Sequence, residues 1–536
     1  METTAVLIVG AGPVGLMLAN QLQRQGIAHV LIDRQLEHSF FCKALGVTAR
    51  TLEIFDDLGI ADEAIDRGVW LRGLRTFDNG EQVAAFDLPE RDLPFGALSL
   101  AQYETEDLLE MSLRRHGGGV ARGWRLDRFV EDADGVQAEL VREGDDPAVT
   151  RTLRCQWLVG CDGAHSRVRA ALGLSFEGGK FPQTFVLGDL DIDWSLPRGY
   201  FYRFSTHRDG QQPNSLAAVP VHGSVRRYRL STMLQDGPEL AMPEGVEATP
   251  PDLERLTAIV QSGLPQGTRL SNLRWSSLYR VSHRIVPSYG KGRVFLAGDA
   301  AHIHPPVGGQ GMNTGLQDAN NLAWKLALAA RGLAAEGLLQ SYDAERRPVG
   351  LDVVEGTSRA LNAVLSQQAT MPGVKETQLL ISYPESPIIV RSKAGVETGL
   401  QAGDRAPDAY GLVRPFVAHP ARLHERLGKG KHRLLCYAGQ EGFAPFSALV
   451  RELAARLPGC SGSLGIVAKG APPADDEAIP LLQDAADNFR SSYNAVPGMA
   501  WLVRPDGHLA WIGHAEEIAE LSSALDLVAA IRSAEL

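Results

Sequence analysis

The sequence predicts a large protein of mixed α/β and α+β class with several domains. Three observations lead to this prediction. The chain begins with a short apolar run, a glycine-rich turn, a helical pattern and a second apolar run that ends in an acid. Its middle part changes to short segments in which apolar and polar residues alternate, as in antiparallel strands. Its last part closes on two strand-like segments around an Asp-Gly turn. With 536 residues, the chain is long enough for about two to four domains.

The N-terminal segment has the pattern of a Rossmann-like dinucleotide site. Residues 5–9 are wholly apolar, and the sequence GAGPVG follows with Gly10, Gly12 and Gly15. Gly10 permits a tight turn, Gly12 lets backbone N–H groups approach a pyrophosphate, and Gly15 lets the helix pack on the strand. Asp33, at the end of the second strand, can bind ribose hydroxyls. A plain glycine turn is the alternative for the motif alone, but the flanking strands and the acid favour a dinucleotide.

A second glycine-rich segment lies at residues 293–327. The strand-like run RVFLAGD ends in Gly298 and Asp299, and the loop PPVGGQG leads into a helical pattern. The first N–H groups of that helix, near Gly311 and Asn313, favour negative charge in the loop. Asp299 could bind a polyol chain, although a helix cap is the simpler alternative for an acid in this place.

A third segment, WLVGCDGAHSRVRAALG, contains Asp162, Gly163, Ser166 and Arg169. Together with GAGPVG and AGDAAHIHPPVGGQGMN, it resembles the motifs of the class A flavin-dependent aromatic hydroxylases. This family includes para-hydroxybenzoate hydroxylase, phenol hydroxylase, pentachlorophenol monooxygenase and polyketide hydroxylases. The motifs occur in family order, and the resemblance covers about residues 1–360. It implies an FAD enzyme that uses NAD(P)H and O2 to hydroxylate an electron-rich phenolic or polyketide-like substrate through a flavin C4a-hydroperoxide.

The resemblance also implies a set of cofactor contacts. The glycine turn and Asp33 would hold the ADP half of FAD, and Asp299 would bind its ribityl chain. Lys43 stands near a position where relatives place a cation beside the flavin, although a solvated charge is the alternative. The implied cofactor-binding residues are Gly10, Gly12, Gly15, Asp33, Arg34, Lys43, Gln102, Asp162, Gly298, Asp299, Pro306, Gly311, Met312 and Asn313.

The candidates for the catalytic group that assists substrate deprotonation lie in the middle segment. In phenol hydroxylase an Asp acts as the base. Leu45 stands at about that position in this sequence, so another residue must act as the base. Tyr202, His222 and Arg227 lie in expected strands of the substrate sheet, and we expect at least one of them to face the flavin.

The domain organisation follows from the resemblance and from the changes in sequence pattern. We expect an FAD-binding domain at 1–180 and 285–345 and a substrate-binding sheet at 181–284, which residues 73–98 join. Helices and a linker are expected at 346–398, and a thioredoxin-like domain at 399–536. The last unit has no Cys-x-x-Cys pair. We therefore expect it to have a structural or dimer-forming role and to be dispensable for the flavin chemistry.

Composition excludes several other classes of protein. The net charge of −11 and the lack of basic runs argue against nucleic acid and anionic membranes as partners. The five Cys have no disulfide-like spacing, and no apolar run is long enough to span a membrane, so we expect a cytoplasmic protein. No third ligand accompanies His302 and His304, so no metal site is expected. Two functional alternatives remain, a flavin oxidase or dehydrogenase without oxygen insertion, and a flavin-binding interaction protein.

Overall fold

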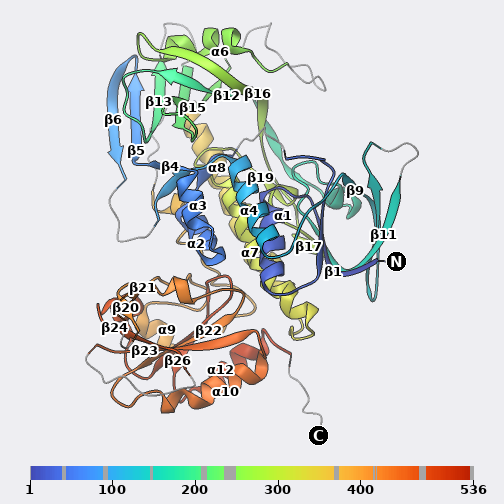
Figure 1. Cartoon of the computed structure of the whole chain (residues 1–536), viewed down its shortest axis with the longest axis vertical. Helices are drawn as coiled ribbons and strands as arrows, with labels where there is room; N and C mark the ends of the chain where they lie inside the picture. The colour runs from blue at the N-terminus through green and yellow to red at the C-terminus, as the bar shows by residue number, and fades with distance from the viewer. Residues whose placement is uncertain are drawn as a thin grey trace.

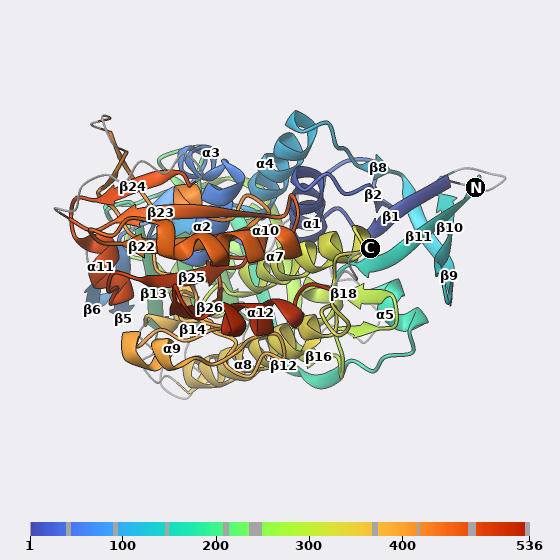
Figure 2. The same ribbon diagram turned by 90° about the horizontal axis from the view of Figure 1, so that it is seen from below.

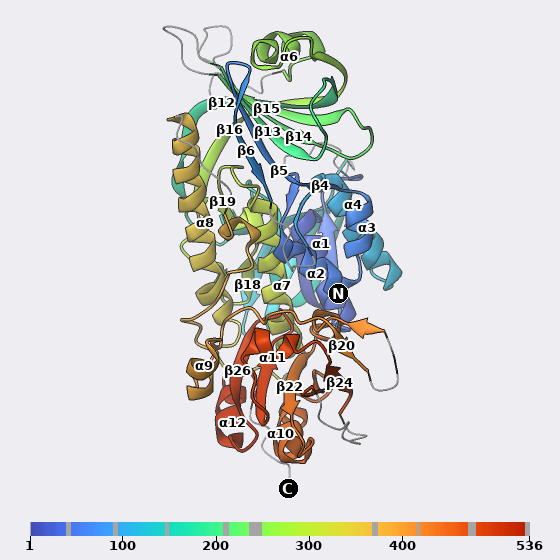
Figure 3. The ribbon, with the colours of Figure 1, turned by 90° about the vertical axis from the view of Figure 1, so that its left-hand side faces the viewer.

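The structure is a computed structural model of the chain. The residues that it describes are 2–38, 44–88, 95–144, 149–206, 214–234, 249–366, 373–414, 417, 419–469 and 479–530. Three large sheets organise this part of the chain. Figure 1 shows the sheet that contains β12 and β16 at one end of the molecule and the C-terminal sheet at the other, with the helices α1 and α7 between them. Helix α8 runs lengthwise along one side (Figure 3).

The described α-helices differ widely in length. Their bounds are α1 (Pro13–Arg24), α2 (Ala49–Leu58), α3 (Ala61–Asp66), α4 (Gln102–Arg115), α5 (Arg167–Ala171), α6 (Leu253–Val260), α7 (Gly311–Ala330), α8 (Ser341–Leu365), α9 (Lys393–Thr398), α10 (Ser447–Arg456), α11 (Asn488–Tyr493) and α12 (Ile518–Asp526). Among the described residues, no helix is both long and apolar enough to cross a membrane.

The first sheet is largely parallel and carries the N-terminal glycine turn. Its strands are β1 (Glu2–Val9), β2 (His29–Asp33), β8 (Ala121–Arg122), β9 (Trp124–Asp132), β10 (Gly135–Arg142), β11 (Thr150–Gly160), β17 (Gly290–Lys291) and β18 (Val294–Leu296). Strand β1 lies between β2 and β11 and is parallel to both. A Cβ atom on Gly10 would lie 2.4 Å from the Cys161 carbonyl oxygen, and one on Gly15 would lie 1.9 Å from the Gly10 oxygen. Both positions therefore require glycine for the turn to pack.

The second sheet is mainly antiparallel, as the alternating pattern of the middle segment predicts. Its strands are β5 (Gly73–Asp78), β6 (Glu81–Asp87), β12 (Glu177–Asp193), β13 (Tyr200–Thr206), β14 (Asn214–Pro220), β15 (Arg227–Met233), β16 (Arg269–Ile285) and β19 (His302–Ile303). One face packs against α6 through buried apolar side chains, among them Tyr202, Phe204 and Leu256. The opposite face is free to form the wall of a site.

The third sheet belongs to the C-terminal unit. Its strands are β20 (Leu412–Val413), β21 (Pro420–Ala421), β22 (His432–Ala438), β23 (Ser461–Val467), β24 (Leu481–Asp484), β25 (Met499–Val503) and β26 (Leu509–His514). Strands β22, β23 and β24 are parallel, whereas β25 and β26 are antiparallel, which gives a thioredoxin-like mixed sheet. Figure 2 shows this unit from below. Cys436 and Cys460 are buried and free, and burial raises the pKa of the Cys436 thiol. A small sheet of β3 (Gly46–Val47), β4 (Val69–Leu71) and β7 (Ala97–Ser99) completes the fold.

A buried ionic cluster joins the C-terminal unit to helices α7 and α8. The turn between β25 and β26 contributes Arg504 and Asp506, α7 contributes Lys325, and α8 contributes Glu345; we call these four residues the bridging cluster. The Arg504 guanidinium donates to both Glu345 oxygens, at 2.6 and 2.9 Å, and its Nε donates to Asp506 at 3.0 Å. Lys325 Nζ donates to Glu345 at 2.8 Å. All four side chains are buried, so their charges must neutralise one another.

Candidate functional site

A cavity of about 1940 Å³ lies between the first sheet and the inner face of the second sheet, with part of α8 along its wall. Small-molecule pockets usually measure about 300–1,000 Å³, so this one has room for a dinucleotide and a second molecule together. Six of the residues implied as cofactor contacts line it: Gly12, Gln102, Asp299, Pro306, Gly311 and Met312. Asp162 does not line it, although its neighbour Gly163 does.

The N-terminus of α1 opens into this cavity. Gly12 is the N-cap, and no side chain caps the first turn. A Cβ atom at Gly12 would meet nothing within 4 Å, so the backbone faces open space there. Free N–H groups and the helix dipole make such an end attractive to an anion. Asp33 lies beside the turn and accepts from the backbone N–H groups of Ala11 at 2.7 Å and Gln35 at 2.8 Å.

Several of the expected contacts lie behind the cavity wall. Gly10, Gly15 and Gly298 shape turns under it, and Arg34 is exposed beside Asp33. Lys43 lies outside the described residues.

Asp162 and Asp299 occupy different places at the same end of the cavity. Asp162 Oδ2 accepts from the backbone N–H of Arg167 at 2.7 Å, at the start of α5. Its Oδ1 is buried and has no hydrogen-bond partner in the described part of the chain. Asp299 is exposed and lines the cavity. Asp299 can therefore contact a polar ligand directly, whereas the Asp162 carboxylate holds the start of α5 in place.

The N-terminus of α7 also opens into the cavity without a side-chain cap. Gly311 and Met312 line the space, whereas Asn313 is buried behind them. Asn313 Nδ2 donates to the Gly46 oxygen at 2.9 Å, and its Oδ1 accepts from the Thr48 N–H at 3.0 Å. The side chain of Asn313 therefore fixes the loop before α2 against the start of α7, and the backbone N–H groups of α7 are left for a ligand.

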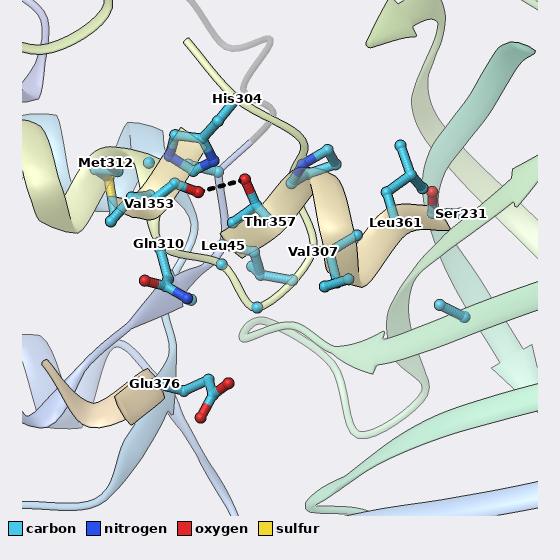
Figure 4. A pocket seen from close by; sticks show the side chains of 18 of the residues that line it. Leu45, Ser231, His304, Val307, Gln310, Met312, Val353, Thr357, Leu361 and Glu376 are labelled. Carbon is cyan, nitrogen blue, oxygen red and sulfur yellow. Dashed lines mark hydrogen bonds between the residues drawn. The ribbon is translucent and has the colours of Figure 1, made fainter. Parts of the chain in front are cut away.

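His304, for which the sequence predicted only that it binds no metal, lies in the cavity wall as a largely buried polar group. Figure 4 shows it close to Met312 and near Thr357 of α8. Its Nδ1 pairs with the Pro305 carbonyl oxygen at 2.8 Å, and its Nε2 has no partner in the described structure. Burial lowers the pKa of His304 to about 4, so the ring is neutral at physiological pH. A ring whose Nδ1 carries the proton presents Nε2 as a hydrogen-bond acceptor in the cavity.

Three rows of side chains on the inner face of the second sheet form the other wall of the cavity. Strand pairing defines each row, because residues opposite one another point to the same face. The first row includes Leu74, Phe201, Val219 and Arg229, the middle row Thr76, Arg203, Ala217 and Ser231, and the third row Asp78, Ser205, Ser215 and Tyr279. Arg229 also hydrogen-bonds the Asp189 carboxylate, at 2.7 and 2.9 Å.

None of the three residues expected to assist deprotonation lines this cavity. Tyr202 is buried on the opposite face, where its hydroxyl donates to the Pro197 oxygen. His222 is exposed in the turn after β14, and Arg227 Nε donates to Asp191 at 2.8 Å. The placement expected for them is therefore wrong. Alternation along β13 turns Arg203 to the cavity and Tyr202 away from it, and the pattern YFYRFST does not reveal which side faces a ligand.

Comparisons with known proteins agree with this geometry. Residues 3–357 match the family described as FAD binding domain. The chain is 34% identical to 6-methylpretetramide 4-monooxygenase of Streptomyces rimosus, over 97% of this chain and 92% of that protein. It is 32% identical to pentachlorophenol 4-monooxygenase of Sphingobium chlorophenolicum, over 76% of each. The crystal structure of aklavinone-11 hydroxylase with FAD and aklavinone matches with a TM-score of 0.79 and 27% identity, over 98% of both chains.

The chain belongs to the class A FAD-dependent aromatic monooxygenases. It is an FAD-dependent enzyme that hydroxylates an aromatic substrate, with NAD(P)H and O2 as co-substrates. The predicted family, fold class, activity and cofactors are thereby confirmed, and the alternatives without oxygen insertion are not supported.

Proposed function

We propose that the protein hydroxylates a fused-ring, polyketide-type aromatic substrate that binds between the flavin and the inner face of the second sheet. The observation that carries this proposal is the size of the cavity, about 1940 Å³, which exceeds the need of a dinucleotide and a single-ring phenol. Its second wall offers apolar and aromatic side chains such as Phe201 and Tyr279 beside scattered hydroxyls. The relatives 6-methylpretetramide 4-monooxygenase and aklavinone-11 hydroxylase support the same class of substrate.

We propose that FAD lies across the two open helix ends. The N-terminus of α1 at Gly12 and the nearby Asp33 would hold the ADP half, and the exposed carboxylate of Asp299 would accept from the ribityl hydroxyls. Gln102, Pro306 and the backbone at Gly311 to Met312 would border the ring. The remaining implied residues act behind this surface: Gly10, Gly15 and Gly298 through the turns, Asp162 and Asn313 through backbone contacts, with Arg34 and Lys43 kept as proposals from the resemblance.

The protein contributes position and electrostatics, since bound FAD supplies the acceptance of hydride and the activation of O2. The N–H groups at the start of α7 favour negative charge on whatever they contact, which suits a reduced flavin. Neutral His304 leaves Nε2 available to accept a hydrogen bond in a space walled by Met312 and α8. Burial of the aromatic substrate against the sheet would exclude water from the reacting edge.

We also propose that the enzyme is cytoplasmic and that its partner is a small aromatic molecule rather than nucleic acid. The four described Cys are free and buried, and the net charge is −11. A homodimer through the C-terminal unit stays a prediction, which the mass of the purified protein in solution would check.

The experiment that tests the substrate class is an oxygen-labelling assay. Fused-ring phenols such as anhydrotetracycline and single-ring phenols such as pentachlorophenol would be incubated with the FAD enzyme, NAD(P)H and isotopically labelled O2. We expect labelled product and rapid NAD(P)H oxidation with the fused-ring compounds. Equal or better turnover of the single-ring phenols would contradict the proposed class, and unlabelled product would contradict oxygen insertion.

Replacement of Asp299 tests the orientation of FAD. The variant Asp299→Ala should bind FAD about tenfold more weakly, because the ribityl hydroxyls lose a charged acceptor whose hydrogen bond is worth about 1.5–3 kcal/mol when shielded and less when exposed. Titration of the apoprotein with FAD measures the affinity. The variant Asp352→Ala, which removes another carboxylate that lines the cavity, serves as the control. A larger loss of affinity at the control would show that Asp299 has been given the wrong role.

A further inference from the structure

Arg203 occupies the centre of the cavity wall on the second sheet. It lies on β13 between Thr76 of β5 and Ala217 of β14, and all three side chains line the cavity. The row that contains Arg229 lies two residues along the strands, or about 7 Å, closer to the loop that contains Ala44. Arg229 marks that side because its guanidinium reaches the Ala44 carbonyl oxygen. Arg203 therefore faces the half of the cavity that lies away from the flavin-binding loops.

Arginines on β5 and β15 of the same sheet are held by carboxylates, and Arg203 is not. Arg75 pairs with Asp87, Arg227 with Asp191, and Arg229 with Asp189. For Arg203, no hydrogen bond or ion pair exists with any residue in the described ranges. The charged group nearest along the same face is Asp78, which lies one row further out, opposite Ser205.

The surroundings of Arg203 make this lack of a partner costly. The side chain is half-buried, and burial lowers the pKa of its guanidinium below the ordinary value. A partly desolvated charge without a counterion is unfavourable, and an acidic ligand in the cavity would relieve this cost. The planar guanidinium is also suited to binding a carboxylate or another ionised oxygen through two parallel hydrogen bonds. Hydroxyls of Thr76 and Ser231 in the same row add further donors.

We propose that Arg203 determines substrate specificity by binding an ionised acidic group, a carboxylate or an equally acidic hydroxyl, at the end of the aromatic substrate remote from the flavin. This inference rests on the proposed function, because it places a fused-ring substrate along the sheet. It also fixes the orientation of that substrate. The acidic end binds at the row of side chains that contains Arg203, and the opposite end reaches the flavin. The assignment replaces Arg227, whose guanidinium is already paired with Asp191 outside the cavity.

The test uses rhein, a dihydroxyanthraquinone carboxylic acid, and its methyl ester, which has the same rings but no carboxylate. Binding to the FAD enzyme would be measured by isothermal titration, without turnover. We expect the wild type to prefer the acid, and Arg203→Met to lose about tenfold to a hundredfold in affinity for the acid but less than about threefold for the ester. Arg203→Lys should recover part of the preference, because it restores the charge without the planar fork.

The control is Arg75→Met, the same change on the neighbouring strand, at a side chain that points to the other face. It should leave the preference for the acid intact, and thermal melting would confirm that each variant folds. A wild type that binds the acid no better than the ester overturns the inference, as does an equal loss for both compounds in Arg203→Met. A preference for the acid in an enzyme that oxygenates no fused-ring phenol would refute the proposed function alone.

Discussion

Replacing Gly12 with valine should abolish tight FAD binding while leaving the fold in place. A Cβ atom at this position meets no protein atom within 4 Å, and the backbone φ of −74° is ordinary for any residue. The added methyl groups would occupy the space in which a pyrophosphate must approach the N–H groups of α1. We expect the affinity for FAD to fall by at least about a hundredfold, which corresponds to about 2.7 kcal/mol.

Two further variants separate this effect from a loss of stability. Valine is a poor N-cap, so Gly12→Val should lower the free energy of unfolding by about 1 kcal/mol. Gly12→Ser carries a favoured N-cap residue and should keep its stability, yet it should also bind FAD more weakly, because its side chain enters the same space. Gly119→Val, at an exposed position with equally open surroundings, should change neither quantity. Normal FAD affinity in Gly12→Val would show that the cofactor does not cross this helix end.

Replacing Arg504 with methionine should destabilise the whole protein by about 3–5 kcal/mol. The change removes the main counterion of Glu345 and Asp506 and leaves two buried carboxylates with Lys325 as the remaining cation of the bridging cluster. Lys325 hydrogen-bonds Glu345, but one lysine cannot balance two buried carboxylates. Chemical denaturation followed by circular dichroism would measure the free energy of unfolding.

The matched control for this prediction is an exposed pair. Arg391→Met breaks the ion pair with Glu385, whose side chain is 88% exposed, and should cost less than about 1 kcal/mol. If Arg504→Met does not accumulate as folded protein, Glu345→Gln keeps the shape of the cluster while it removes one buried charge. If Arg504→Met and Arg391→Met lowered the free energy of unfolding by similar amounts, burial of the cluster would not be the cause of its contribution to stability.

The glycine turn and the two helix ends were predictable from sequence because their chemistry is local. Gly10, Gly12 and Gly15 lie within a single turn, and the start of α7 follows directly after the loop that contains Pro306. The substrate wall was not predictable in the same way. It depends on which face of β13 looks inward, and period-two alternation leaves that choice open until the sheet is placed against the rest of the molecule. The sequence therefore pointed to Tyr202, whereas the structure places its neighbour Arg203 on the cavity side of β13.

The contribution of α8 and of the C-terminal unit also depends on contacts between distant parts of the chain. Thr357 and Leu361 carry no motif, and their position along the cavity follows only from the packing of a long helix beside the second sheet. The lack of a Cys-x-x-Cys pair predicts that the C-terminal unit has no dithiol redox role, and this stays a prediction. It gave no sign, however, that Arg504 and Asp506 would be buried against α7 and α8, and this burial argues against a dispensable unit.

The bridging cluster limits how freely this architecture can be recombined. Arg504 and Asp506 come from the C-terminal unit, and Lys325 and Glu345 come from α7 and α8. The buried charges of a C-terminal unit taken from a relative would therefore not match those of α7 and α8 in this protein. A working chimera would need to carry Lys325 and Glu345 together with the turn that holds Arg504 and Asp506. Although it has its own sheet and its own core, the C-terminal unit is therefore not an interchangeable module. Substitutions in its turn between β25 and β26 should be accompanied by substitutions in α7 and α8.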